Sequence, residues 1–209
     1  MIYQTDETRE RILSMATRLF VERGLFATQM QDIAIEVGIS RTSLYRYYRD
    51  KFDLATAIVH TMFSFMRAHW RDEAEQRLAG LNGLACVDSF LRNYWLSPGF
   101  ATELYYLAEY DAFFSGVRVA EGIGDRLKES FVNDTPNPLI KYLEQGMTDG
   151  SIRPDLDVHL TAVTLVNAVR GLHQRIILRG KVLVEVDPRE LPQMTDELVR
   201  HLVNGIRTF

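Results

Sequence analysis

Basic side chains gather in one short stretch of this 209-residue chain, whose formal net charge is −4. The bases between positions 41 and 51 are Arg41, Arg46, Arg49 and Lys51. Asp50 is the single acid among them, so the stretch carries a local charge of +3. A short basic patch suits a polyanion better than a membrane surface, and the alternative is an ordinary solvated helix surface.

The residues around this patch carry the start and stop signals of two short helices. Thr28 to Gln31 has the form of a capping box, which predicts a helix over 29–36. Gly38 can supply the positive φ of a tight turn, and Ser40 can cap a helix over 41–47. Two short helices joined by a glycine-containing turn form a helix-turn-helix.

The second helix of such a motif lies in the major groove of DNA, with its inner side pinned to the first helix. The apolar residues that would form the pin are Ile33, Val37, Ile39 and Leu44, with the small Ala34 at the crossing. The side chains left on the outer side are Arg41, Thr42, Ser43 and Arg46. Arginine can bond guanine bidentately, and a threonine methyl can meet a thymine methyl. Tyr47 and Lys51 are placed to hold phosphate.

The run from Gly24 to Leu54 resembles the N-terminal domain of the TetR (TetR/AcrR) family of bacterial transcriptional regulators. The matching positions are Thr28 or Gln29, Ile33-Ala34, Val37 to Ser40, Leu44-Tyr45, Tyr47-Tyr48, Lys51 and Leu54. The DNA-contacting positions that this resemblance implies are Gln29, Arg41, Thr42, Ser43, Tyr45, Arg46, Tyr47 and Lys51. Thr42 stands where many members have Gly, which bears on base preference, and Tyr48 stands where most have Phe.

Apolar residues recur at helical spacing along almost the whole chain, which predicts an all-helical (all-α) fold. Further helices are expected near 7–23, 52–78, 83–96, 100–114, 117–132, 137–148, 157–179 and 190–206, with Gly24 capping the first. We expect a three-helix DNA-binding domain over 1–51 and a larger helical effector-binding and dimerisation domain over 52–209.

The rest of the composition fits a cytoplasmic protein. The single cysteine, Cys86, can form no intramolecular disulfide. The N-terminal stretch has no signal-sequence pattern, and no apolar run approaches the roughly 18 residues that a membrane span needs.

The resemblance implies that the last two helices, 157–179 and 190–206, pair with those of a second copy to form a homodimer. Both are richly apolar, as an interface requires. An ordinary core would explain this composition equally well.

An unusually aromatic region over 90–118 suggests a site for an apolar or aromatic effector. The ligand-binding candidates are Phe63, Met66, Trp70, Phe90, Tyr94, Trp95, Tyr105, Glu109, Phe113, Asn167, Arg170 and His173. Further polar candidates are Asn93, Asp111 and Arg118. Helical proteins also bury aromatic residues as core, and the two tryptophans fit that alternative well.

Other motifs are weaker. Gly122-Ile-Gly124 lacks the strand and third glycine of a dinucleotide site, and the acids of 155–159 are more simply helix caps than metal ligands. With no catalytic constellation, we expect neither an enzyme nor a cofactor or metal. We expect a transcriptional regulator, a repressor that a small apolar or aromatic effector releases from a palindromic operator. The alternatives are a helical enzyme, or a DNA-binding protein of this fold that acts through protein contacts without an effector.

Overall fold

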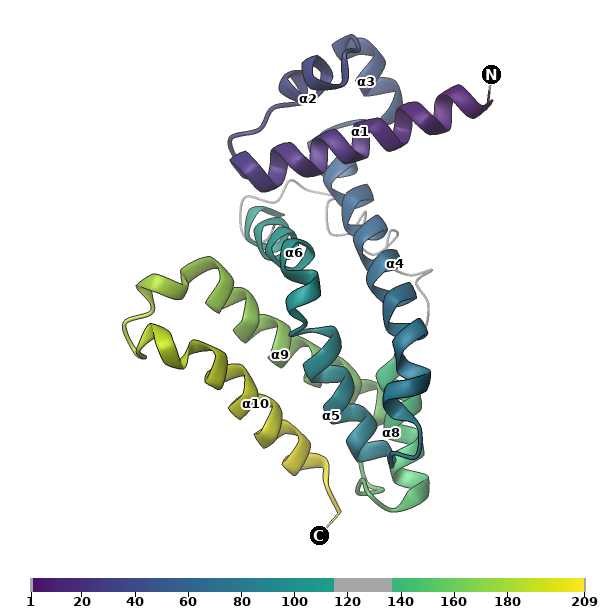
Figure 1. The fold of residues 1–209 in the computed structure, drawn as a ribbon, viewed down its shortest axis with the longest axis vertical. Helices are drawn as coiled ribbons and strands as arrows, with labels where there is room; N and C mark the ends of the chain where they lie inside the picture. The colour runs from purple at the N-terminus through teal and green to yellow at the C-terminus, as the bar shows by residue number, and fades with distance from the viewer. Residues whose placement is uncertain (1, 115–136, 209) are drawn as a thin grey trace. The chain divides into compact units, whose positions relative to one another are not determined.

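The computed structural model describes residues 2–114 and 137–208, and these form helices with no strand among them. The helices are α1 (Ile2–Arg23), α2 (Met30–Val37), α3 (Arg41–Tyr47), α4 (Lys51–Leu78), α5 (Gly83–Tyr94), α6 (Ala101–Phe114), α8 (Pro138–Asp149), α9 (Val158–Arg179) and α10 (Leu191–Ile206) (Figure 1). Short 3-10 turns cover Pro98–Phe100 (η1), Gly180–Val182 (η2) and Pro188–Glu190 (η3). The predicted all-α class is confirmed. The expected helix 117–132, Arg118 and Gly122-Ile-Gly124 lie outside the described residues.

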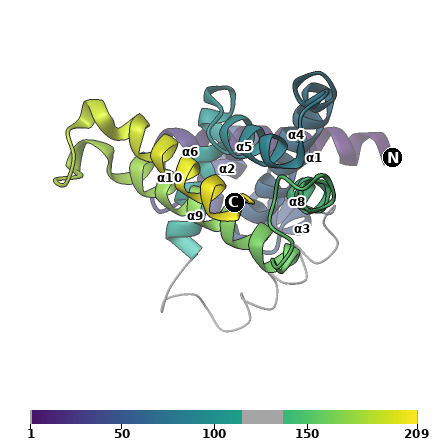
Figure 2. The same ribbon diagram turned by 90° about the horizontal axis from the view of Figure 1, so that it is seen from below.

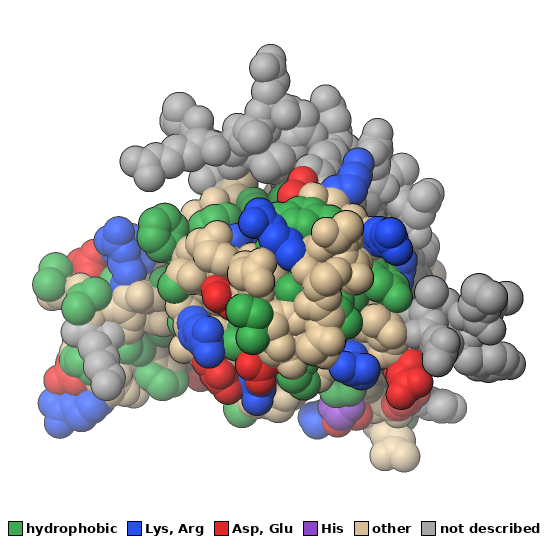
Figure 3. All heavy atoms as spheres, turned by 90° about the horizontal axis from the view of Figure 1, so that it is seen from above, with side chains coloured by type: hydrophobic (Ala, Val, Ile, Leu, Met, Phe, Trp, Pro, Cys, Tyr) green, Lys and Arg blue, Asp and Glu red, His purple; other side chains and the backbone are tan. Residues whose placement is uncertain are grey.

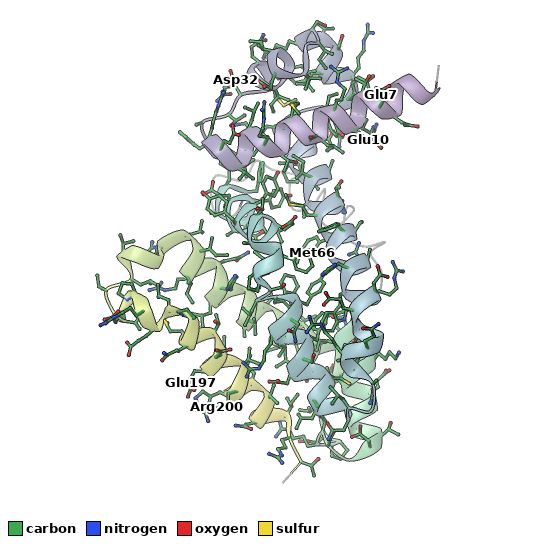
Figure 4. The ribbon with its side chains drawn as sticks, viewed as in Figure 1. Glu7, Glu10, Asp32, Met66, Glu197 and Arg200 are labelled. Carbon is green, nitrogen blue, oxygen red and sulfur yellow. The ribbon has the colours of Figure 1, made fainter. Side chains whose placement is uncertain are left out.

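The start of α2 differs from the expected capping box by one residue. Thr28 is buried, and its hydroxyl donates to the carbonyl oxygens of Leu19 at 3.2 Å and Gly24 at 2.9 Å. The N-cap is therefore Gln29, whose backbone N–H donates to the carboxylate of Asp32 at 2.8 Å. Figure 4 labels Asp32 on α2. The prediction that Thr28 caps α2 was wrong because its hydroxyl is already bonded to the end of α1.

The chain divides into two compact units. Unit 1 comprises Met1–Phe65 and Tyr105–Asn133, and unit 2 comprises Met66–Leu104 and Asp134–Phe209. The residues of α4 and of α6 are thus shared between the two units. The domain boundary after residue 51 stays a prediction, since compactness alone does not define a domain that folds by itself.

Unit 1 holds α1, α2, α3, the first half of α4 and the end of α6. Its core contains Ile12, Leu19, Phe20, Leu25, Ile33, Leu44 and Leu54, all fully or almost fully buried. Tyr106 of α6 packs on Phe20 of α1, with ring centroids 6.2 Å apart. Its hydroxyl donates to the carbonyl oxygen of Ala55 at 3.2 Å, so α6 is bonded to α4 inside this unit.

Unit 2 contains α5, α8, α9 and α10, and α9 and α10 run side by side in both ribbon views (Figures 1 and 2). The C-terminal end of the chain pairs with the segment after α8, where the backbone N–H of Arg153 donates to the carbonyl oxygen of Ile206 at 3.1 Å. No helix within the described ranges is long and apolar enough to cross a membrane.

Gly83 lets α5 and α8 approach closely. A Cβ atom at Gly83 would lie 2.0 Å from the backbone nitrogen of Gly146 and 2.6 Å from the carbonyl oxygen of Tyr142. The backbone N–H of Gly83 also donates to the carboxylate of Asp149 at 2.7 Å. Because backbone atoms rather than flexible side chains occupy this space, no rotamer change can make room for a methyl group.

We therefore expect Gly83→Ala to force the two helices apart and to lower the free energy of unfolding by about 2 kcal/mol or more. Urea unfolding followed by circular dichroism measures the change. Gly99→Ala is the matched control, because a Cβ atom there would meet only the side-chain oxygen of Ser97 at 3.4 Å. Equal stability of the two variants would contradict a close α5–α8 crossing.

Candidate functional site

The turn between α2 and α3 has the geometry that a helix-turn-helix requires. Gly38 adopts φ +75°, as predicted, and the N–H groups of Gly38 and Ile39 return to carbonyl oxygens of α2 at 3.0 Å. Ser40 caps α3 by accepting from the backbone N–H of Ser43 at 3.0 Å, which confirms a second prediction. These bonds fix the point at which α3 begins.

Burial then fixes which side of α3 faces outward. Leu44 is 0% exposed, and Tyr48, which follows the helix, is 4% exposed. The exposed residues on α3 are Arg41, Thr42, Tyr45 and Arg46, while Ser43 and Tyr47 are half-buried. Figure 3, a view from above, shows lysine and arginine side chains interspersed with acidic, apolar and other uncharged ones. The arrangement leaves cationic and hydroxyl donors available to an anionic partner.

Two of these exposed side chains contact each other. The guanidinium of Arg41 lies 5.5 Å from the ring centroid of Tyr45 and within 3.5 Å of its hydroxyl. The pair is one helical turn apart, and the aromatic ring limits the positions that the long arginine side chain can adopt. Gln29, the N-cap of α2, is also exposed.

Helix α1 supports the helix-turn-helix from behind. Arg18 forms an ion pair with Glu36 at the end of α2, and Arg11 donates to the carbonyl oxygen of Val37. Arg9 lies over the ring of Tyr48, 5.7 Å from the centroid, and burial raises the pKa of that tyrosine. The ends of both short helices are therefore bonded or packed to α1.

Lys51 has a different environment from the bases of α3. It is half-buried, and its ammonium donates to the carbonyl oxygen of Leu25 at 2.7 Å. The same ammonium lies 5.2 Å from the ring centroid of Phe113 on α6. Burial lowers the pKa of Lys51, and the carboxylate of Asp32 opposes this shift. Sequence analysis expected a phosphate contact here and did not single out Leu25.

Five of the predicted ligand-binding residues are buried side chains of unit 2: Met66, Trp70, Phe90, Tyr94 and Trp95. The rings of Phe90 and Tyr94 are stacked at 4.8 Å, and Trp70 meets Phe90 edge-on at 5.2 Å. The indole N–H of Trp70 donates to the hydroxyl of Tyr142 at 3.2 Å. Sequence analysis did not single out Tyr142, because its α8 position lies far from the aromatic region.

The predicted polar ligands of α9 have mixed environments. Asn167 is exposed, and its amide donates to the carbonyl oxygen of Val163 in the same helix at 2.8 Å. Arg170 and His173 are half-buried, and burial lowers the pKa of His173. At the start of the helix, Asp157 accepts from the backbone N–H of Leu160 at 2.9 Å, so this acid is a helix cap, as predicted.

The remaining ligand candidates belong to unit 1 and are less buried. Phe63 and Glu109 are half-buried, whereas Tyr105 and Phe113 are exposed. A buried polar contact near these residues is the bond between the hydroxyls of Thr56 and Tyr110, at 2.8 Å. Sequence analysis missed Thr56, although a hydroxyl among the apolar inner positions of α4 was a usable signal.

Comparison with known proteins identifies the helix-turn-helix. The family model described as bacterial regulatory proteins, tetR family, matches residues 12–58. The HTH-type transcriptional repressor KstR2 of Mycobacterium tuberculosis is 29% identical over 163 residues, which are 75% of this chain and 75% of KstR2. The HTH-type transcriptional regulator AcrR of Shigella flexneri is 38% identical over 55 residues, or 26% of each chain.

Solved structures share the fold over nearly the whole chain. The TetR-family repressor FadR of Thermus thermophilus superposes with a TM-score of 0.68 at 20% identity, covering 96% of both chains. The KstR2 structure of Mycobacterium tuberculosis gives a TM-score of 0.53 at 22% identity, covering 96% of this chain and 95% of that one. At these identities the superpositions support the fold alone.

The motif, its geometry and these matches agree. Proteins of this kind bind DNA and regulate transcription, which is a non-enzymatic function, and dimerisation and ligand binding are typical of them. Residues 12–58 therefore resemble the DNA-binding part of the tetR family of bacterial regulatory proteins, and the longer matches are to transcriptional repressors that contain the same motif.

Proposed function

We propose that this protein is a homodimeric repressor that binds a pseudo-palindromic operator and is released from it by a small apolar or aromatic effector. The observation that carries the proposal is the outward face of α3, where Arg41, Thr42 and Arg46 are exposed while Leu44 is fully buried. A recognition helix needs this division, because one side must pack on the domain while the other meets base edges.

Within this proposal the α3 side chains have separate roles. Arg41 and Arg46 bond guanine edges, and Thr42 and Ser43 contact bases beside them. Tyr45 orients Arg41 through the ring contact, whereas Tyr47 and Gln29 hold phosphates. Lys51 supports the binding of all sequences alike, because it lies outside the row of base-reading side chains.

The exposed side of α9 supports dimerisation. Leu160, Val163 and Leu178 are 63%, 42% and 40% exposed, and their spacing places them on one side of the helix. Gly171 lies on the same side, and a Cβ atom there would meet nothing within 4 Å. In a monomer, the exposed apolar stripe would contact water and the mid-helix glycine would lower the stability of α9. A second copy packed against α9 would bury the stripe.

A two-fold dimer would place its two recognition helices about 34 Å apart, in successive major grooves of the operator. An effector that favours another conformation, in which α4 tilts, would change this separation and weaken DNA binding. Effector and DNA must then weaken each other by the same factor, because the coupling is reciprocal.

The buried aromatic cluster of unit 2 is our proposed region for the effector. Apolar and aromatic walls suit a ligand with a large apolar body. KstR2 is a ketosteroid transcriptional regulator, and FadR was solved in complex with lauroyl-CoA, so one regulator of this fold holds a molecule with a long apolar chain. The second candidate function, DNA binding without an effector, would leave the cluster as ordinary core, and the ring packing alone is compatible with that.

Selection of bound duplexes from a random pool, at a stated salt concentration, should recover one inverted repeat.

On that repeat, Arg41→Ala or Arg46→Ala should each relax base preference at one position per half-site, at a cost of about 1 to 3 kcal/mol per bidentate contact. Ser14→Ala, at an exposed position of α1, is the control and should change nothing. Equal losses on every sequence would overturn the assignment of base readers.

Charges placed on the α9 stripe should dissociate the dimer. The double variant Leu160→Glu, Val163→Glu should raise the dimer dissociation constant by at least about tenfold, since each charge enters the interface twice. Sedimentation equilibrium measures the change. Thr102→Glu adds a charge at an exposed position of α6 and should leave the dimer intact. A double variant that remains as dimeric as the unchanged protein would place the interface elsewhere.

A ligand that binds the native state must raise the melting temperature. At a ligand concentration one hundred times the dissociation constant, the free energy of unfolding rises by about 2.7 kcal/mol. We expect this with lauroyl-CoA or with a ketosteroid, and we expect the same compound to weaken operator binding. Coenzyme A without an acyl chain is the matched control. If neither compound shifts the melting temperature or the operator affinity, the function without an effector gains support.

A further inference from the structure

The ammonium of Lys51 connects three parts of unit 1 that are distant in sequence. Lys51 is the first residue of α4, its hydrogen-bond acceptor Leu25 lies in the connection between α1 and α2, and Phe113 lies in the last turn of α6. The acceptor is inside the protein, because Leu25 is 0% exposed. One side chain thus joins the connection that leads into the helix-turn-helix to the end of α6.

The position of this cation needs a compensating interaction. The N-terminal end of a helix carries a partial positive charge, which disfavours a lysine in the first turn. Partial burial of Lys51 adds to this cost, as the lowered pKa reflects. The Leu25 carbonyl, the π face of Phe113 and the carboxylate of Asp32 offset this cost. Lys51 is therefore held by specific protein atoms and does not extend freely into solvent.

Aromatic contacts surround the same point. Phe113 meets Phe26 of the α1–α2 connection edge-on at 6.4 Å, and Phe114 meets Phe52 of α4 at 5.0 Å. Tyr110, one turn earlier in α6, bonds the hydroxyl of Thr56. The last turn of α6 therefore contacts both the α1–α2 connection and the start of α4, and a change at Phe113 would alter its contacts with both.

From this geometry we propose that Lys51 is a positioning residue, which fixes the connection before α2 to the last turn of α6 through the Leu25 carbonyl and the Phe113 ring. Lys51 then contributes to DNA affinity through this contact. A helix-turn-helix that is already fixed in place loses less conformational entropy when it binds DNA. The proposal rests on the proposed function for its DNA readout. A phosphate ligand, by contrast, would act through its charge at the DNA.

Salt dependence separates the two roles. Each phosphate contact contributes about 0.9 to the slope of log affinity against log salt concentration, so losing one per subunit of a dimer would lower the slope by about 2. Binding of Lys51→Met, Phe113→Leu and the double variant to a duplex of mixed sequence would be measured over a series of salt concentrations. On a duplex of mixed sequence Arg46, on the exposed side of α3, has no cognate guanine and its charge acts on the phosphates, so Arg46→Met is the control that should lower the slope.

We expect Lys51→Met and Phe113→Leu each to weaken binding by about three- to tenfold with an unchanged slope. The double variant should be no weaker than either single variant, because both remove the same contact. A lower slope for Lys51→Met, together with normal binding by Phe113→Leu, would overturn the proposal and make Lys51 a phosphate ligand.

A second measurement does not depend on DNA. Thermal unfolding of the unchanged protein, the two single variants and the double variant should show that the melting temperature falls in each single variant and falls little further in the double variant. Additive losses would mean that the two side chains do not act together, which would overturn the proposal. If the unchanged protein bound no duplex while the unfolding cycle stayed non-additive, the DNA-binding function would fail and the Lys51–Phe113 contact would stand.

Discussion

Burial of Leu44 is the constraint on which the rest of the DNA-binding surface depends. With one side chain of a seven-residue helix fixed inward, helical geometry places the others. Arg41, Thr42 and Arg46 must then lie on the outward side of the helix. The cap at Ser40 and the left-handed turn at Gly38 set where the helix begins, so they decide which residue occupies the buried position.

The contacts of α6 in unit 1 give this surface a support beyond its own three helices. Tyr106 and Tyr110 bond α4 through the Ala55 carbonyl and the Thr56 hydroxyl, and both bonds are buried. Buried hydrogen bonds are directional, so they fix register where apolar packing alone would permit sliding. In a regulator, these bonds would let a shift of α6 change the position of the helix-turn-helix.

Much of the fold was predictable because glycines, prolines and caps separate the helices clearly. The predicted bounds of α3 match the structure residue for residue, and those of α2 differ by one. The error at Thr28 had a tertiary cause, since a hydroxyl that can cap one helix was bonded to the end of another. The aromatic region was also recognised, but its arrangement depended on Tyr142, which approaches from α8.

The sequence by itself determined the helical class, the helix-turn-helix and the outward residues of α3, because each depends on the order of residues within a few helical turns. Only the tertiary structure decided the environment of Lys51. From the sequence its charge and place in the motif indicated phosphate, but its partners are a carbonyl on the α1–α2 connection and a ring on α6. Local spacing cannot reveal partners that approach from distant parts of the chain, because packing rather than periodicity brings them together.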